Sequence, residues 1–160
     1  MSPRINRSQL DVYSYFHICA RGNNGENIFR QEKDYCKYLS VVERSFRSNT
    51  IRCFAFCLMT NHVHFLLQVP GLSRLSGAIH SAHTSYAIYF NACYARSGHL
   101  FSDRFRSWVI KDANHFLSAK EYIEQNPVYA GLVKNKKQYR WSSGGRGTEL
   151  SITSLLPIGY

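Results

Sequence analysis

Short apolar runs alternate along the chain with longer stretches in which apolar side chains recur every three or four residues. Runs rich in β-branched and aromatic residues, bounded by turn residues, predict strands, and the longer periodic stretches predict helices. Two of the apolar runs flank Thr60-Asn61 and predict a β-hairpin. The predicted strands cover residues 12–20, 51–59, 62–69 and 105–110, and the predicted helices cover residues 31–47, 72–95 and about 113–126.

Capping and breaking residues set the expected ends of the last two helices. Gly98 closes the second helix. Asp112 is a suitable N-cap for the third helix, because its carboxylate can accept a hydrogen bond from a free N–H group of the first turn. Pro127 disfavours helical dihedral angles at Asn126 and predicts that the third helix ends there.

The order of these elements is β-α-β-β-α-β followed by one extra helix. It predicts an α+β fold of the ferredoxin-like, split βαβ type, with a four-stranded antiparallel sheet and helices on one face. The extra helix carries Tyr122. We find no repeat or domain boundary, so residues 1–160 are expected to form one domain. Because residues 142–147 are rich in Ser and Gly, we expect residues 1–11 and 142–160 to be flexible or partner-docking ends.

Charge and composition narrow the class of partner. Lys and Arg number 20 against 10 Asp and Glu, which gives a net charge of +10, and 14% of the residues are aromatic. Cations for phosphates and rings for unstacked bases favour a nucleic-acid partner. No apolar run approaches the roughly 20 residues of a membrane span. A polar N-terminus and an odd number of cysteines, five, favour a cytoplasmic protein with reduced thiols, associated with the nucleoid when bound to DNA.

The most informative motif is His62-Val63-His64 in the second arm of the predicted hairpin. Residues i and i+2 of a strand point to the same face, so both imidazoles project together, as two ligands of one metal ion would. A histidine pair on a strand is more often structural or simply exposed. The meaning of this one depends on the residues that accompany it.

Tyr122 and Asn126 lie four residues apart on the third predicted helix and therefore share one face. If that helix crosses the sheet near the hairpin, His62, His64 and Asn126 form a three-ligand site beside a tyrosine hydroxyl. Nitrogen and oxygen ligands with positions left for water suit Mg²⁺ or Mn²⁺. Such an ion polarises a scissile phosphate, which helps a tyrosine that is a weak nucleophile at neutral pH.

Several further motifs follow one another in order between about Tyr13 and Ser143. With these motifs the chain resembles the single-tyrosine transposases of the His-hydrophobic-His superfamily, in the branch of the REP-associated tyrosine transposases. The matching segments are residues 16–23 (FHICARGN), 28–29 (IF), 58–67 (LMTNHVHFLL), 89–91 (YFN), 98–105 (GHLFSDRF), 122–133 (YIEQNPVYAGLV) and 141–143 (WSS).

This resemblance implies a ferredoxin-like homodimer that binds single-stranded or hairpin DNA. It implies cleavage of one strand with a divalent metal and formation of a 5′-phosphotyrosine bond, so that the strand can be rejoined elsewhere. His62 and His64 take the two histidine ligand positions and Tyr122 takes the nucleophile position. Asn126 falls where the family places Gln or Asn as a third ligand. Thr60 stands where Pro is frequent, and Glu124-Gln125 replaces a commoner His-Leu.

Four more residues are candidates for DNA contact. Arg21 follows the first predicted strand, and His99, Arg104 and Arg106 precede or enter the fourth. Arginine suits bidentate contacts to phosphate or guanine, although a basic loop can also serve only solubility.

Purely structural explanations of these residues also remain open. Tyr122 on an apolar-spaced helix could be a packed core residue, and Asn126 before Pro127 could be only a C-terminal cap. A zinc set made of Cys53, Cys57 and the two histidines is disfavoured, because i and i+4 on a strand are about 13 Å apart. His80 and His83 are one turn apart on the second helix, and a solvated face explains them.

Two non-catalytic functions remain as alternatives to the transposase. The chain could be a catalytically silent DNA-hairpin-binding protein derived from a transposase, or a ferredoxin-like RNA-binding module that uses aromatic side chains on its sheet. A metal-dependent covalent adduct with DNA would separate the enzyme from both.

Overall fold

Four antiparallel strands form the central layer of the computed structural model, which describes residues 15–145. The strands are β1 (Tyr15–Arg21), β2 (Arg52–Leu58), β3 (His62–Gln68) and β4 (Arg106–Val109). They lie in the order β2-β3-β1-β4, so the first strand of the chain occupies the interior of the sheet. The order and the antiparallel pairing are those of the predicted ferredoxin-like fold.

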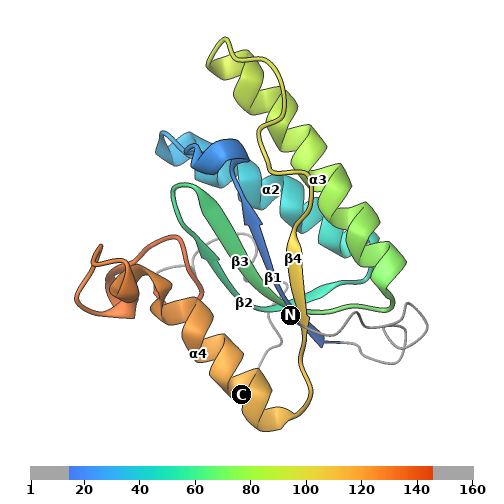
Figure 1. The fold of residues 1–160 in the computed structure, drawn as a ribbon, viewed down its shortest axis with the longest axis vertical. Coiled ribbons are helices and arrows are strands. Elements are labelled where there is room, and N and C mark those ends of the chain that lie inside the picture. The colour runs from blue at the N-terminus through green and yellow to red at the C-terminus, as the bar shows by residue number, and fades with distance from the viewer. Residues whose placement is uncertain (1–14, 146–160) are drawn as a thin grey trace.

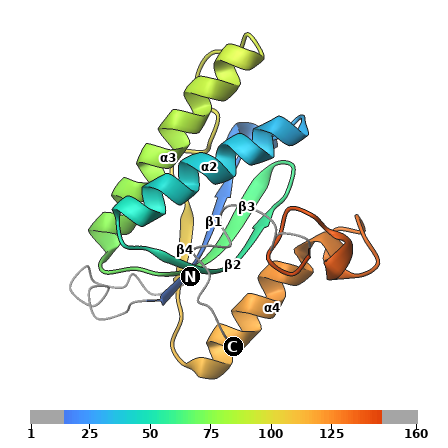
Figure 2. The same cartoon turned by 180° about the vertical axis from the view of Figure 1, so that it is seen from behind.

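Three helices cover the two faces of this sheet, as Figures 1 and 2 show. They are α2 (Glu32–Ser48), α3 (Leu72–Cys93) and α4 (Ala113–Tyr129), and two short 3₁₀ turns are η1 (Asn23–Gly25) and η2 (Lys136–Gln138). Helices α2 and α3 pack against each other over one face. Helix α4 packs on the other face, against β2 and β3. The predicted fold class is therefore confirmed, with the extra helix alone on its own side.

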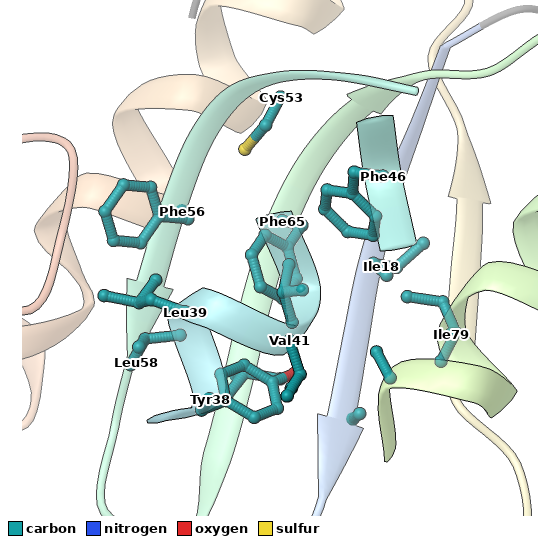
Figure 3. Close-up of a cluster of buried hydrophobic side chains, with 14 of the residues drawn as sticks. Ile18, Tyr38, Leu39, Val41, Phe46, Cys53, Phe56, Leu58, Phe65 and Ile79 are labelled. Carbon is teal, nitrogen blue, oxygen red and sulfur yellow. The ribbon is translucent and has the colours of Figure 1, made fainter. Parts of the chain in front are cut away.

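The main core lies between the sheet and the α2/α3 layer. Alternate residues of β3 (Val63, Phe65 and Leu67) point into it, because the side chains of a strand alternate between its faces. Phe65 is fully buried among the rings of Tyr38, Phe46 and Phe56, as the close-up in Figure 3 shows. The intervening residue, His64, points to the face covered by α4.

Helix α4 is longer than the sequence predicts. It continues through Pro127 to Tyr129, whereas the prediction ends it at Asn126. Proline removes only one N–H donor, and the backbone N–H groups of Ala130 and Leu132 still reach the carbonyls of Asn126 and Pro127. Ala130 caps the helix, and the next residue, Gly131, has a φ of +72° that suits a glycine. The prediction that Gly98 closes the previous helix is also off, because α3 ends at Cys93.

The beginning of the expected flexible end is packed. Ser142 is fully buried and forms an isolated β-bridge with Cys57. The backbone N–H of Phe56 donates to the Ser143 hydroxyl at 3.0 Å, and the Ser143 N–H donates back to the Phe56 carbonyl at 3.0 Å. Ser142 and Ser143 therefore pair with the edge of β2. Residues 1–11 and 146–160, the rest of that prediction, lie outside the described part of the chain.

His83 departs from the predicted solvated face of α3. Its Nε2 is 3.0 Å from the Tyr38 hydroxyl and its ring stacks on Phe101 with centroids 3.8 Å apart. Burial, reinforced by the nearby His80, lowers the pKa of His83 to about 3. His80 itself is exposed, as expected.

None of the helices in residues 15–145 is long and apolar enough to cross a membrane.

Candidate active site

The face of the sheet beneath α4 carries polar and aromatic side chains on three adjacent strands. Directly paired residues of antiparallel strands point to the same side, so the strand register sets which side chains meet. We call this surface the site face. Its residues are His17, Cys19 and Arg21 on β1, His62 and His64 on β3, and Arg106 and Trp108 on β4.

The two histidines of the motif lie together on this face. Their ring centroids are 5.1 Å apart and the ring planes are nearly perpendicular, at 83°. His62 is half-buried, and its Nδ1 is 2.7 Å from the Oδ1 of Asn61 in the hairpin turn. His64 is only 5% exposed. The predicted same-face arrangement of the pair is therefore present.

Helix α4 brings its two candidate residues over these histidines. The ring of Tyr122 makes an edge contact with the ring of His64, with centroids 6.0 Å apart. The Tyr122 side chain remains 47% exposed, so one side of the phenol faces solvent. The Asn126 side chain lies near the His62 ring and partly raises the pKa of that imidazole. Its Nδ2 donates to the Tyr122 carbonyl at 3.1 Å. One chain thus brings the tyrosine, both histidines and the amide together.

Local sequence explains why α4 lies across the sheet in this way. The Asp112 carboxylate accepts a hydrogen bond from the His115 N–H at 2.7 Å, which caps the first turn as predicted. Ala119 and Ile123 are buried against Leu66 of β3 and Cys57 of β2. These contacts fix the buried side of α4, and Tyr122, one residue before Ile123, then lies at the border between the sheet and solvent.

A buried carboxylate attaches α4 to the segments that follow it. Glu124 is only 4% exposed. Its Oε1 accepts from the Lys120 Nζ at 2.9 Å and from the Ser143 hydroxyl at 3.0 Å, and its Oε2 lies 3.2 Å from the Lys136 Nζ. Because a buried charge is costly unless its partners are present, this cluster restricts how α4 can rotate. Glu124 is also one of the three residues, with Thr60 and Gln125, that differ from the motifs of the family that the chain resembles.

Sequence reasoning missed His17. It belongs to one of the matching segments, yet the sequence does not give the register of β1 against β3 that aligns His17 with the site. The Nε2 of His17 is 3.0 Å from the Nδ1 of His64, which is a hydrogen bond between the two rings. The His17 ring also contacts Tyr122, with centroids 5.9 Å apart. The signal that could have found it is the even spacing of His17, Cys19 and Arg21 on one face of a predicted strand.

The site environment keeps all three histidines neutral at physiological pH. Burial, with the charges of His17, His62 and Arg21, lowers the pKa of His64 to about 3. Burial and then His115 lower the pKa of His17 to about 4. For His62, burial and Arg21 lower the pKa, while the hydrogen bond with Asn126 raises it in part. Neutral imidazoles keep the lone pairs that a metal ligand needs.

The donor set is compatible with the expected divalent ion. Two imidazoles and one carboxamide oxygen leave coordination positions for water and phosphate oxygens, which suits Mg²⁺ or Mn²⁺. Within residues 15–145 no cluster of three His, Cys, Asp or Glu side chains is arranged to hold a metal. Asn126 is therefore the candidate for a third protein ligand beside the two histidines.

The zinc alternative fails for a reason that spacing does not reveal. A β-bulge in β2 shifts the register between Cys53 and Ala55. Cys53 consequently points into the main core, whereas Cys57 points toward α4. Burial raises the pKa of both thiols, Cys57 with a contribution from Glu124, so neither is a ready thiolate.

The four candidates for DNA contact separate into two groups. Arg21 and Arg106 are exposed on the site face, Arg21 opposite His62 and Arg106 opposite Cys19. His99 and Arg104 are also exposed, but they line a separate hollow of about 1010 Å³ between α3 and residues 98–107. Only the first pair is therefore next to the candidate catalytic residues.

A family model agrees with this arrangement. Residues 12–126 match the family described as "Transposase IS200 like". The matched span contains all of the site residues named above, and Asn126 is its last position. A search of curated proteins gives no match.

Solved structures agree in fold. A REP-associated tyrosine transposase bound to a REP hairpin matches with a TM-score of 0.67 at 17% identity, over 100% of this chain and 91% of that chain. A protein of Deinococcus radiodurans R1, provisionally named a transposase, matches with a TM-score of 0.50 at 13% identity, over 71% of this chain and 90% of that chain. At such low identities the likeness concerns the fold.

Proposed function

Because the chain belongs to the family of IS200-like transposases, we propose that it cleaves and rejoins single-stranded or hairpin DNA with Tyr122 as its nucleophile. Membership of the family makes it a DNA-cleaving enzyme of DNA transposition and recombination. It also sets aside the RNA-binding module. The proposal concerns the residues, the ion and the form of DNA.

The main support for the proposal is that Tyr122 lies next to the histidines of its own chain. The Tyr122 ring lies 6.0 Å from that of His64, and Asn126, one turn further along α4, lies near the His62 ring. A tyrosine that serves only for packing does not require polar neighbours such as these histidines and this amide. A half-exposed phenol beside two neutral imidazoles and an amide can meet a phosphodiester from the solvent side.

In the proposed reaction the Tyr122 Oη attacks the scissile phosphorus. A bond forms between Oη and phosphorus, and the bond between phosphorus and the 3′ oxygen breaks. The leaving oxygen takes up a proton and becomes a 3′ hydroxyl, while the phenolic proton passes to solvent at the exposed side of the ring. The phosphodiester energy is retained in the 5′-phosphotyrosine, so a 3′ hydroxyl of another strand can reverse the step and rejoin the DNA.

His62, His64 and Asn126 would hold Mg²⁺ or Mn²⁺ in this proposal. The bound ion supplies polarisation of the scissile phosphate and neutralises the charge that develops on it. His17 acts through His64: by occupying the Nδ1 of His64, it leaves the Nε2 of that ring as the ligating atom. Partners of this kind commonly fix the orientation of metal-binding histidines.

Hairpin DNA and a second copy of the chain are the proposed partners. The first is supported by the fold shared with a transposase that was solved on a REP hairpin. A second copy of the chain is supported by chemistry. One tyrosine forms one covalent bond with DNA at a time, so the processing of two DNA ends requires two tyrosines. Since Tyr122 lies over the histidines of its own chain, each copy of a homodimer would bring a complete site. Light scattering of the free and the hairpin-bound protein measures this directly.

The decisive experiment tests for the covalent product. Wild-type protein and Tyr122→Phe are incubated with labelled single-stranded hairpin DNAs, with Mg²⁺, Mn²⁺ or EDTA, and resolved under denaturing conditions. We expect a protein–DNA band that needs both the ion and Tyr122, while Tyr122→Phe still binds the DNA. The substitution removes only a hydroxyl, so circular dichroism and thermal unfolding should be unchanged.

An adduct that persists in Tyr122→Phe would assign the nucleophile to another residue. Binding without an adduct across a broad panel of hairpins would favour the catalytically silent hairpin-binding protein.

A further inference from the structure

Helix α4 covers only part of the site face. It packs against β2 and β3, the two strands on one side of the sheet. Strand β4 is the edge strand on the other side. Three of the four residues of β4 are exposed, and one of them is Trp108, which is 40% exposed. A large apolar ring is thus left open to solvent beside the candidate active site.

Trp108 is continuous with the catalytic residues through ring contacts. Its ring lies 4.9 Å from that of His17, which lies 5.2 Å from His64. The His17 ring in turn contacts Tyr122, at 5.9 Å. The indole is therefore separated from the nucleophile by a single imidazole. A strand whose phosphate lies at Tyr122 would bring a neighbouring base close to this indole.

The charges around Trp108 favour a polyanion. Arg106 is two residues away on the same face of β4, and Arg21 lies at the end of β1 opposite His62. Both are exposed to solvent. A stacking ring between cations is the combination by which proteins hold unpaired nucleotides.

The second tryptophan shows what a structural indole looks like in this molecule. Trp141 is only 8% exposed and lies parallel to Tyr35, with ring centroids 4.4 Å apart and an angle of 9° between the planes. The Arg140 guanidinium covers it at 4.7 Å. Trp141 is thus enclosed by protein groups, whereas Trp108 packs against one histidine and leaves part of its ring uncovered.

We propose that Trp108 is a stacking platform for an unpaired base next to the scissile phosphate, with Arg21 and Arg106 holding the flanking phosphates. The inference rests on the proposed function, because it takes the position of the phosphate from Tyr122. It names the class of ligand, a single-stranded segment, for a surface that α4 leaves open. Since Trp108 does not touch the reacting atoms, it is a binding residue and not a catalytic one.

The test uses the two tryptophans as a natural pair of probes. Intrinsic fluorescence of the Tyr122→Phe protein is titrated with an oligo-dT single strand and with a duplex of the same length, in EDTA, so that no chemistry intervenes. We expect the single strand to quench the emission, and the duplex to quench it much less. In Tyr122→Phe/Trp108→Phe, where Trp141 is the remaining indole, the quenching should disappear.

Affinity gives the second readout. By fluorescence anisotropy, Trp108→Ala should weaken binding of the single strand by about 5- to 150-fold, which corresponds to the roughly 1–3 kcal/mol of one base stacked on an aromatic side chain. Trp108→Phe keeps a ring and should recover much of the loss. Leu117→Ala is the control, because Leu117 is a large exposed apolar residue near the start of α4 and lines a different hollow, with Tyr15 and Phe54.

Unchanged affinity in Trp108→Ala, or quenching that survives in Trp108→Phe, overturns the proposal. Equal loss in Trp108→Ala and Trp108→Phe overturns stacking as well, because a ring would then give no rescue. These results are independent of the adduct assay. An adduct with no role for Trp108 refutes only this inference, whereas Trp108 quenching without any adduct supports the platform and refutes the proposed catalysis.

Discussion

The two faces of the sheet are built from the same strands and differ in almost every other respect. On β3, Phe65 points into a layer closed by two helices and is fully buried among three aromatic rings. His64, one residue earlier, points to a layer covered by one helix and contacts His17 and Tyr122. The first face is apolar and sealed. The second is polar, half covered and open at β4.

Most of the stability of the protein thus comes from one face of the sheet, whereas the candidate active site lies on the other. Burial of apolar area is the dominant source of folding free energy, and most of that area lies in the α2/α3 layer. The site face instead buries neutral imidazoles that are paired with one another and with amides. Substitutions on the two faces of one strand should therefore have different consequences, and four experiments probe that separation.

The largest expected effect is on the sealed face. Phe65→Ala leaves a cavity in the centre of the core and should lower the free energy of unfolding by about 3–5 kcal/mol. Urea denaturation followed by circular dichroism measures the change. Adduct formation should then fall only in proportion to the unfolded fraction. A loss of less than about 1 kcal/mol would mean that the core lies elsewhere.

His64→Ala, on the opposite face of the same strand, should change function more than stability. Calorimetric titration with Mn²⁺ should show affinity reduced at least tenfold and the adduct lost. The free energy of unfolding should fall by about 1 kcal/mol, the scale of one lost hydrogen bond. His62→Ala serves as the companion variant. Unchanged Mn²⁺ affinity in both would contradict the proposed ligands.

The sealed face also contains one group that responds to acid. The pKa of His83 is about 3 in the folded protein against 6.5 for an ordinary histidine. Between these values the unfolded chain binds a proton that the folded chain does not, so stability falls as the pH is lowered. The contribution of His83 is about 2 kcal/mol at pH 5, since each pH unit below 6.5 costs about 1.4 kcal/mol.

Urea titrations of wild type and His83→Gln at pH 7 and pH 5 measure that contribution. Glutamine keeps a polar partner for the Tyr38 hydroxyl and does not titrate, so the variant should lose less stability than wild type between the two pH values. His80→Gln, on the exposed side of α3, should behave as wild type does. An identical pH dependence in His83→Gln would show that acid acts through other groups.

The smallest effect is expected from single cations on the open face. Arg106→Ala should reduce the dependence of log affinity on log salt concentration by about one phosphate contact, with a modest loss of affinity. Anisotropy titrations of a labelled single strand at several salt concentrations give the slope. Arg44→Ala, on the exposed side of α2, is the control. If both variants keep the wild-type slope, the site face is not where the backbone of the DNA lies.

The sequence was most informative where the pattern is local. The helical spacing around Tyr38 and Phe46, the hairpin turn at Thr60-Asn61 and the Asp112 cap each depend on residues close in the chain, and the structure has each of them. The His62/His64 pair also needs only the alternation of side chains along one strand.

What the sequence did not reveal depends on long-range pairing. His17 meets His64 across 47 residues, and Ser143 meets Phe56 across 87, so neither contact leaves a local pattern. The Ser/Gly composition near Ser143 resembles that of a linker, yet a side chain at Gly144 would collide with Glu124 and one at Gly145 with the Tyr139 carbonyl. The prediction that α4 ends before Pro127 was wrong for the opposite reason. The local effect of proline on the helix was outweighed by the backbone hydrogen bonds that resume beyond it.

The position of β1 has a consequence for the order in which the protein is made. This strand is synthesised before the other three described strands but lies inside the sheet. Its hydrogen-bonding partners, β3 and then β4, follow only later. The tyrosine comes later still, and the Glu124 attachment of α4 is complete only when Lys136 and Ser143 have followed. A ribosome must therefore finish almost the whole described chain before the groups that would attack DNA stand together. Until Ser143 has been added, the attachment that holds α4 over the proposed site is incomplete.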